Sequence, residues 1–250
     1  MIALEFPPIN AILRWQDVAP SFNKIAIIAV LATIIGCTIF ALAARADARK
    51  APRGVRNLAE SSVEFIENGV IMQTMGRDGL GWTPFLLTLF LFIYLCNVPG
   101  IIPFFQMPAT ARMAIPAALA LMVWVVYNGA GIKHQGFGGY FKSVLFPPGV
   151  PKALYILVTP IEFISAIIVR PFSLAVRLFA NMLAGHILLV TFTVLCITLF
   201  TASLLAIVLP FSFAMLVGLT GFEIMVAFLQ AYIFTILAAV YIGSSMHAEH

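Results

Sequence analysis

Residues 153–200 read ALYILVTPIEFISAIIVRPFSLAVRLFANMLAGHILLVTFTVLCITLF and are almost continuously apolar. Residues 202–246 form a second segment of the same kind. As straight helices, each would run about 65 to 70 Å at 1.5 Å per residue, whereas the hydrocarbon core of a bilayer is only about 30 Å thick. Each segment must therefore be steeply tilted, broken or folded back. We favour two long, strongly inclined helices packed antiparallel, with two short hairpins as the alternative.

The composition of the whole chain indicates that a bilayer is its solvent. Of the 250 residues, 62% are hydrophobic and only 10% are charged, whereas soluble domains carry about 25% charged residues. The net charge of +4 does not indicate nucleic-acid binding, because the basic residues are dispersed or sit just outside apolar spans. Cys37, Cys96 and Cys196 lie inside apolar runs without metal-ligand spacing. We therefore expect no metal, no disulfide and no cofactor.

Three shorter apolar spans precede the long segments, at residues 25–44, 85–105 and 114–132. Together with the long pair, they predict five membrane crossings in a single all-α membrane domain. Within it, residues 1–23 read as an irregular leader, and residues 24–152 as peripheral helices and loops. Residues 153–250 then form the long tilted hairpin.

Charges beside the spans predict the topology. A basic cluster follows the first span: Arg45, Arg49, Lys50, Arg53 and Arg56. Because such clusters stay on the cytoplasmic side, we expect the N-terminus outside and, after five crossings, the C-terminus in the cytoplasm. Residues 55–75 interleave apolar residues with Glu60, Glu64 and Glu67, a pattern typical of an amphipathic helix at the membrane interface or against a partner.

The two long segments keep polar and ionisable side chains at membrane depth: Glu162, Arg170, Arg177, Asn181, His186, Glu223 and Gln230. An ionisable side chain at the centre of a spanning helix costs about 2.5 to 3.5 kcal/mol on insertion scales, so each is a candidate functional residue. The alternative is that these groups pair with one another only to fix the helix bundle.

Helical periodicity sorts these side chains onto faces. At about 100° per residue, Arg170, Arg177 and Asn181 fall within about 60° of one another on one stripe, while His186 points to nearly the opposite side from Arg177. Glu223 and Gln230 share a stripe of the last helix. An antiparallel hairpin could bring Glu223 near His186, and Gln230 near Arg177. A permanent cation would then lie beside a carboxylate and an imidazole, which can pass protons near neutral pH. Such an arrangement suits a device that admits protons from one side without letting them run straight through.

The run RPFSLAVRLFANMLAGH, residues 170–186, closely resembles the signature of subunit a of F-type ATP synthases. The runs LFLFIYLCNVPGIIPFF (89–105), TPIEFIS (159–165) and LQAYIFTILAAVYI (229–242) are similar to further parts of that family. The resemblance implies a proton-translocating stator subunit in the inner membrane of a bacterium, surrounded by lipid. It also implies partners: a rotating c-ring, the peripheral-stalk b subunits and the rest of the ATP synthase.

The resemblance also implies roles for individual residues. The family's arginine that matches Arg177 faces the ring carboxylates and separates two aqueous half-channels. The other matching positions are His186 and Glu223 in the outer half-channel, Asn181 and Gln230 near the arginine, and Glu162 in the cytoplasmic half-channel. Some bacterial members carry an acid in place of His186 and a histidine in place of Glu223, so the pair is exchanged here. The stretch between Glu162 and Pro171 is a residue longer than in some relatives.

Other function classes fit the residues less well. A secondary transporter or channel usually shows internal repeats and broken helices in two matching halves, and the sequence shows no such repeat. A membrane scaffold would leave the buried charges unexplained. Because the sequence has no phosphate-binding glycine loop, we expect the chain not to be catalytic alone and nucleotide chemistry to lie on other subunits. Arg170, directly before Pro171, is expected to be a packing or lipid-facing residue.

Overall fold

A computed structural model describes residues 17–19, 22–45, 53–102, 108–146, 154–201 and 205–246. The α-helices there are α2 (Lys24–Arg45), α3 (Val55–Ile66), α4 (Met72–Thr74), α5 (Thr83–Asn97), α6 (Ala114–Gln135), α7 (Phe137–Leu145), α8 (Tyr155–Ile164), α9 (Arg170–Thr201) and α10 (Leu209–Met246). Two π-helices, Glu67–Ile71 and Ser165–Val169, continue α3 and α8. Short 3-10 helices are Gly76–Trp82, Val98–Gly100, Ala109–Ala111 and Leu205–Val208. Strands β1 (Asp17–Ala19) and β2 (Phe22–Asn23) pair antiparallel.

Five helical segments of the described chain are long and apolar enough to cross a membrane: Ile25–Arg45, Gly76–Gly100, Ala114–Gln135, Tyr155–Phe200 and Leu209–Met246. They confirm the predicted all-α membrane fold with five crossings. The second apolar run reaches residue 105, but α5 ends at Asn97 and is followed by a 3-10 turn. Pro99 in that turn cannot continue an α-helix. Most of the predicted leader, and Arg49 and Lys50 of the basic cluster, lie outside the described residues.

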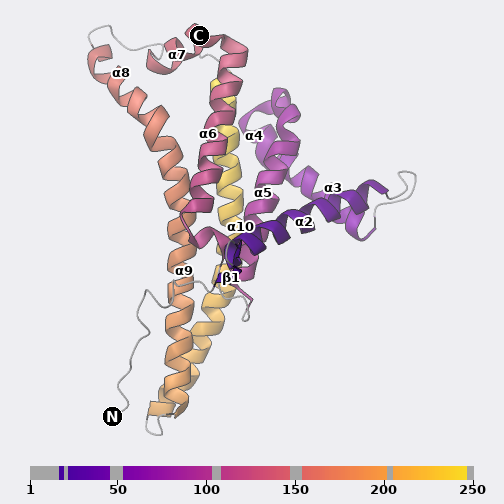
Figure 1. The fold of residues 1–250 in the computed structure, drawn as a ribbon, viewed down its shortest axis with the longest axis vertical. Coiled ribbons are helices and arrows are strands. Elements are labelled where there is room, and N and C mark those ends of the chain that lie inside the picture. Colours follow the sequence, from indigo (N-terminus) through magenta and orange to yellow (C-terminus); the bar gives the residue numbers. More distant parts are fainter. Residues whose placement is uncertain are drawn as a thin grey trace.

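The long hairpin takes the favoured form of two continuous rods rather than two short hairpins. The first rod runs without interruption from α8 through the π-helix into α9, and the second is α10. At 1.5 Å per residue, the 38 residues of α10 extend about 57 Å, which exceeds the roughly 30 Å hydrocarbon core. Figure 1 shows α9 and α10 side by side near their connection and diverging toward the other end, where α6 packs against both.

The helices α2 and α3 indicate how the long rods are inclined. In Figure 1 both project sideways from the long axis of α9 and α10. The 22 residues of α2 are close to the roughly 20 residues that cross a bilayer directly. Because α2 and the long rods differ strongly in direction in Figure 1, a bilayer that α2 crosses directly would hold the rods strongly inclined.

The predicted amphipathic helix at residues 55–75 is formed by α3, the π-helix Glu67–Ile71 and α4. Its apolar side is buried through Ala59, Ile66 and Val70, while Glu60 and Glu64 are exposed. Glu60 pairs with Arg56 one turn earlier, at 2.6 Å. The acidic face therefore points away from the core, as the alternation of charged and apolar residues predicted.

The main core lies between α3 with the π-helix that continues it, α5, α6, the first part of α9 and the C-terminal half of α10. Ile93 of α5, Val123 of α6 and Phe234 of α10 are almost completely buried there. Small residues of α10, such as Ala231 and Ala238, are buried as well and allow the helices to approach closely. This core fixes the C-terminal half of α10. The last part of α9 and the first part of α10, which lie side by side near their connection, extend from the core as an arm (Figure 1).

Candidate functional site

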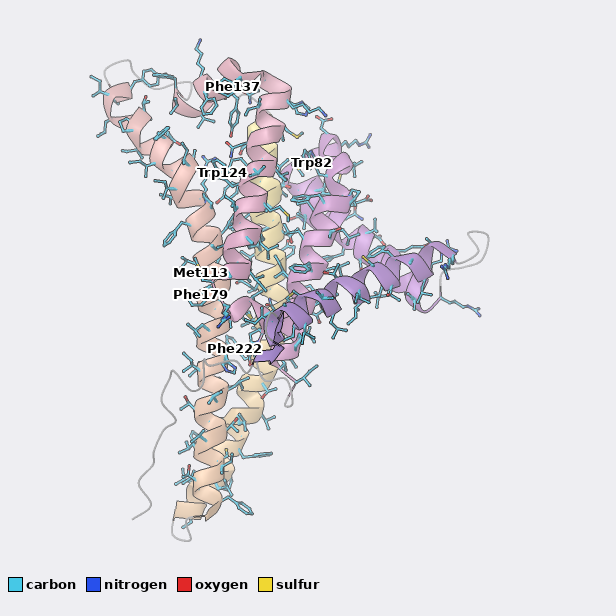
Figure 2. The ribbon with its side chains drawn as sticks, viewed as in Figure 1. Trp82, Met113, Trp124, Phe137, Phe179 and Phe222 are labelled. Atoms are coloured by element: carbon cyan, nitrogen blue, oxygen red, sulfur yellow. The ribbon has the colours of Figure 1, made fainter. Side chains whose placement is uncertain are left out.

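A cavity of about 340 Å³ lies between α9 and α10. Its polar lining comes from Asn181, Glu223 and Gln230, and its other walls are mainly aliphatic. Figure 2 labels Phe179 near the level of Met113, just before α6 begins, and Phe222 beyond it on the arm. The cavity has room for several water molecules at about 30 Å³ each, and a hydrated cavity is a medium in which protons can move.

Asn181 and Gln230 link the two long helices across this cavity. The Asn181 side-chain Nδ2 donates a hydrogen bond to Gln230 Oε1 over 2.7 Å. Gln230 is 2% exposed, and its Nε2 has no hydrogen-bond partner among the described residues. Because Asn181 follows Arg177 by one helical turn, the contact places Gln230 beside the stripe that carries the arginine.

Glu223 faces α9 at Gly185. A Cβ atom built on Gly185 would lie 3.1 Å from Glu223 Oε1, so the absence of a side chain there lets the carboxyl approach the backbone. Glu223 and His186, the next residue of α9, are both buried, at 5% and 4% exposure. Glu223 Oε2 has no hydrogen-bond partner within the described chain. His186 is not among the residues that line the cavity, so its predicted proximity to Glu223 stays a prediction.

Arg177 is exposed on α9, and among the described residues no carboxylate lies within ion-pair distance of it. Exposed residues continue along the same stripe at Asn181, Ala184 and Leu188. Phe222 and Leu229 of α10 are also exposed beside the cavity. We call these six residues the α9–α10 strip. An unpaired guanidinium on a membrane helix is costly, so the strip favours a partner that brings a negative charge.

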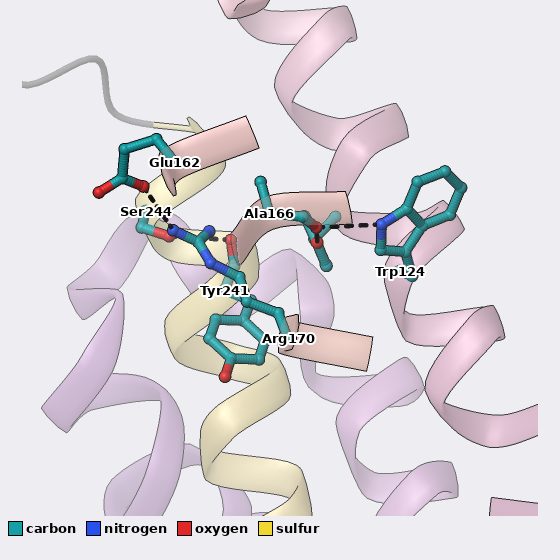
Figure 3. A network of polar contacts seen from close by, with 7 residues as sticks. Trp124, Glu162, Ala166, Arg170, Tyr241 and Ser244 are labelled. Atoms are coloured by element: carbon teal, nitrogen blue, oxygen red, sulfur yellow. Dashed lines mark hydrogen bonds and ion pairs between the residues drawn. The ribbon is translucent and has the colours of Figure 1, made fainter. Parts of the chain in front are cut away.

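Glu162 and Arg170 meet at the other end of the first rod. Arg170 Nη2 lies 4.0 Å from Glu162 Oε2, and the Arg170 guanidinium carbon lies 5.6 Å from the centre of the Tyr241 ring of α10. Figure 3 shows the guanidinium between the carboxylate and the ring. Arg170 was expected to pack or to face lipid; it packs over the Tyr241 ring and also lies beside Glu162, at the centre of this cluster.

The same cluster includes residues that sequence reasoning missed. Trp124 and Tyr127 of α6 direct their polar atoms at the π-helix that separates Glu162 from Arg170. Tyr241 also went unnoticed, although it lies inside a run that resembles the family. Their residue type could have pointed to them, because a tryptophan or tyrosine inside a membrane span usually has a partner for its polar atom. No group of His, Cys, Asp or Glu in the described parts of the chain is placed to hold a metal ion.

Comparison with known proteins connects this geometry to a family. Residues 25–243 match the family model described as ATP synthase A chain. The chain is 45% identical over 249 residues to ATP synthase subunit a of Frankia alni, covering 95% of this chain and 84% of that protein. It is 40% identical over 237 residues to ATP synthase subunit a of Rhodococcus erythropolis, with 91% and 83% covered. Against ATP synthase subunit a of Maricaulis maris, it is 38% identical over 240 residues, with 92% and 90% covered.

Proposed function

This chain belongs to the ATP synthase A chain family, and we propose that it carries protons through two half-channels that meet at Arg177. Family membership makes it a multi-pass membrane component of a bacterial F-type ATP synthase, concerned with proton transport and ATP synthesis. The proposal adds the route of the proton and its coupling to the rotation of a c-ring.

Arg177, which is exposed and has no ion-pair partner among the described residues, carries this proposal. A guanidinium stays charged at every accessible pH, and it stands on a strip whose other members are small, apolar or amide residues. A ring carboxylate that passes the strip would find its counter-ion there and would be favoured in its charged form. Away from the strip, the ring carboxyl can face lipid only when neutral.

The cavity between α9 and α10 supplies the outer half-channel of the proposed route. Glu223 and His186 would relay protons to the ring through it, and the Asn181–Gln230 bond would hold the contact between α9 and α10 next to Arg177. Glu162, at the other end of the rod, would belong to the cytoplasmic half-channel. Each charge that crosses 100 mV is worth about 2.3 kcal/mol, and the fixed positive charge of Arg177 would prevent a direct leak between the two halves.

The proposed role also implies where the partner subunits bind. The c-ring would pass along the α9–α10 strip, so residues 153–250 would form the rotor-facing part. Residues 24–152 would form the peripheral part, with the peripheral-stalk b subunits bound there. Arg45 ends α2 and Arg53 and Arg56 lie at the start of α3, which supports a cytoplasmic connection between these helices. The N-terminus would then lie outside and the C-terminus in the cytoplasm.

The decisive experiment changes Arg177 in the intact ATP synthase. In membrane vesicles, Arg177→Ala should abolish ATP synthesis driven by an imposed proton gradient, while the complex still assembles. Arg112→Ala is the matched control, because Arg112 is also exposed but does not line the cavity. Normal proton-driven synthesis by assembled Arg177→Ala enzyme would refute the proposal.

A further inference from the structure

The π-helix Ser165–Val169 stands between Glu162 and Arg170. A π turn holds about one residue more than an α turn. Eight α-helical steps would rotate position 170 by about 80° from position 162, whereas seven would leave the two about 20° apart. By absorbing one residue, the π-helix returns Glu162 and Arg170 to the same side of the rod, where their 4.0 Å contact forms.

Two side chains of α6 anchor the π-helix from outside. Trp124 Nε1 and the Tyr127 hydroxyl both donate to the backbone oxygen of Ala166, at 3.2 and 2.8 Å. Tyr127 is 1% exposed, and Figure 3 shows the indole of Trp124 directed at Ala166. A carbonyl inside a widened turn is thereby satisfied by another helix. The irregular turn is therefore bound to α6 and has a defined orientation.

The Arg170 guanidinium is held by an aromatic face as well as by a carboxylate. It lies over the Tyr241 ring at 5.6 Å, within the range of a cation–π interaction. The phenols of Tyr127 on α6 and Tyr140 on α7 also lie within its electrostatic reach. Burial raises the pKa of Tyr140, and the positive charge of Arg170 opposes that rise. A planar guanidinium can stack and pair at once, which a lysine ammonium cannot do as well.

We propose that Arg170 is a positioning residue of the cytoplasmic proton path, which holds the Glu162 carboxylate in a fixed direction. This inference rests on the proposed role of Glu162. The Glu162 and Arg170 side chains are about one-third exposed, at 35% and 31%. The Glu162 carboxylate can therefore still exchange protons with its surroundings. The Tyr241 ring fixes the guanidinium, and the guanidinium in turn fixes the carboxylate.

The test uses intact ATP synthase in inverted membrane vesicles, whose outer face is the cytoplasmic side. ATP-driven proton pumping is measured against the pH of the outer medium. Arg170→Gln should slow pumping on the order of tenfold and should shift its dependence on the outer pH, whereas Arg170→Lys should recover part of the rate. Tyr241→Phe should retain a higher rate than Tyr241→Leu, because it keeps the ring, and Tyr241→Leu should resemble Arg170→Gln. Arg77→Gln, at an exposed arginine outside the cluster, is the control.

A double-substitution cycle separates positioning from general damage. In a Glu162→Gln background, Arg170→Gln should cause no further loss, because the group that Arg170 positions has already lost its charge. An unchanged rate and pH profile in assembled Arg170→Gln enzyme would overturn the inference, and so would losses that simply add. Full activity of Glu162→Gln would instead remove the cytoplasmic assignment of Glu162 from the proposed function. Loss of synthesis in Arg177→Ala is independent of either result.

Discussion

Asn181 on α9 and Gln230 on α10 are joined by a 2.7 Å hydrogen bond that fixes the register of the long hairpin. Four residues further along α9, Gly185 faces Glu223 of α10. The amide pair and the buried carboxyl therefore line one seam, and the cavity follows this seam. Substitutions in α9 or α10 at this level should alter proton movement, and the effect of each contact can be measured separately.

The amide pair should behave as one unit in a double-mutant cycle. We expect Asn181→Ala and Gln230→Ala each to slow ATP-driven proton pumping, because each leaves the other amide without its partner. The double variant should be little worse than either single variant, with a coupling free energy of about 0.5 to 1.5 kcal/mol. Pumping rates in vesicles with equal amounts of assembled enzyme provide the measurement. Strictly additive losses would show that the two side chains act independently.

Glu223→Gln should slow proton uptake while leaving the hairpin folded. The amide has nearly the shape of the carboxyl group, but it cannot take up and release a proton in the working pH range. The expected result is a lower rate of pumping and of passive proton conduction, with normal assembly. Glu64→Gln, an exposed acid of α3, is the matched control. Unchanged rates in Glu223→Gln vesicles would contradict a proton-carrying role for Glu223.

A bulky side chain at Gly185 should close the cavity. The Cβ atom of Gly185→Ala would lie 3.1 Å from Glu223 Oε1, which a small shift of the glutamate side chain can relieve. Alanine should therefore have a small effect and leucine a large one. We expect Gly185→Leu to reduce passive proton conduction on the order of tenfold or more, because its side chain would occupy the space beside the carboxyl. Gly129→Leu is the control, since nothing lies within 4 Å of a Cβ at Gly129 of α6. Equal conduction in both variants would exclude the cavity from the route.

Gly131 is predicted to matter for stability rather than for proton movement. A Cβ atom there would overlap the Tyr140 ring, whose hydroxyl donates a 2.9 Å hydrogen bond to Asn128 Oδ1. Gly131→Ala should therefore push α7 away from α6 at a cost of about 1 to 3 kcal/mol. A thermal-unfolding scan of the detergent-purified protein should show a lower Tm than for Gly129→Ala. An equal Tm would mean that the ring moves aside freely.

The sequence predicted the spans, the long hairpin and the stripe of Arg177 and Asn181, because each follows from length or helical period within one segment. The apolar run of residues 153–200 exceeds the bilayer so far that inclination was required. Its period also placed His186 away from Arg177, and the structure buries His186 while it exposes Arg177. These features are local, so they can be derived from a single stretch of residues.

The cluster around Arg170 could not be predicted in the same way. The π-helix depends on donors from Trp124 and Tyr127, which lie about 40 positions earlier in the chain. Counting at 100° per residue across this stretch assumes a regular helix and therefore misplaces Glu162 relative to Arg170. The contact with Tyr241 likewise depends on how two distant helices pack. Where tertiary contacts reshape the helix itself, periodicity alone gives the wrong face.

The α9–α10 strip has a mechanical consequence. Its hydrocarbon members, among them Leu188, Phe222 and Leu229, offer dispersion contacts that are individually weak and have no fixed direction. A surface that slides past them exchanges one such contact for another of equal worth, so the barrier to each step stays small. In the proposed mechanism, the charge of Arg177 would hold a passing carboxylate at one position along the strip. The strip would then let a rotating partner move past with little resistance, except where its carboxylate meets Arg177.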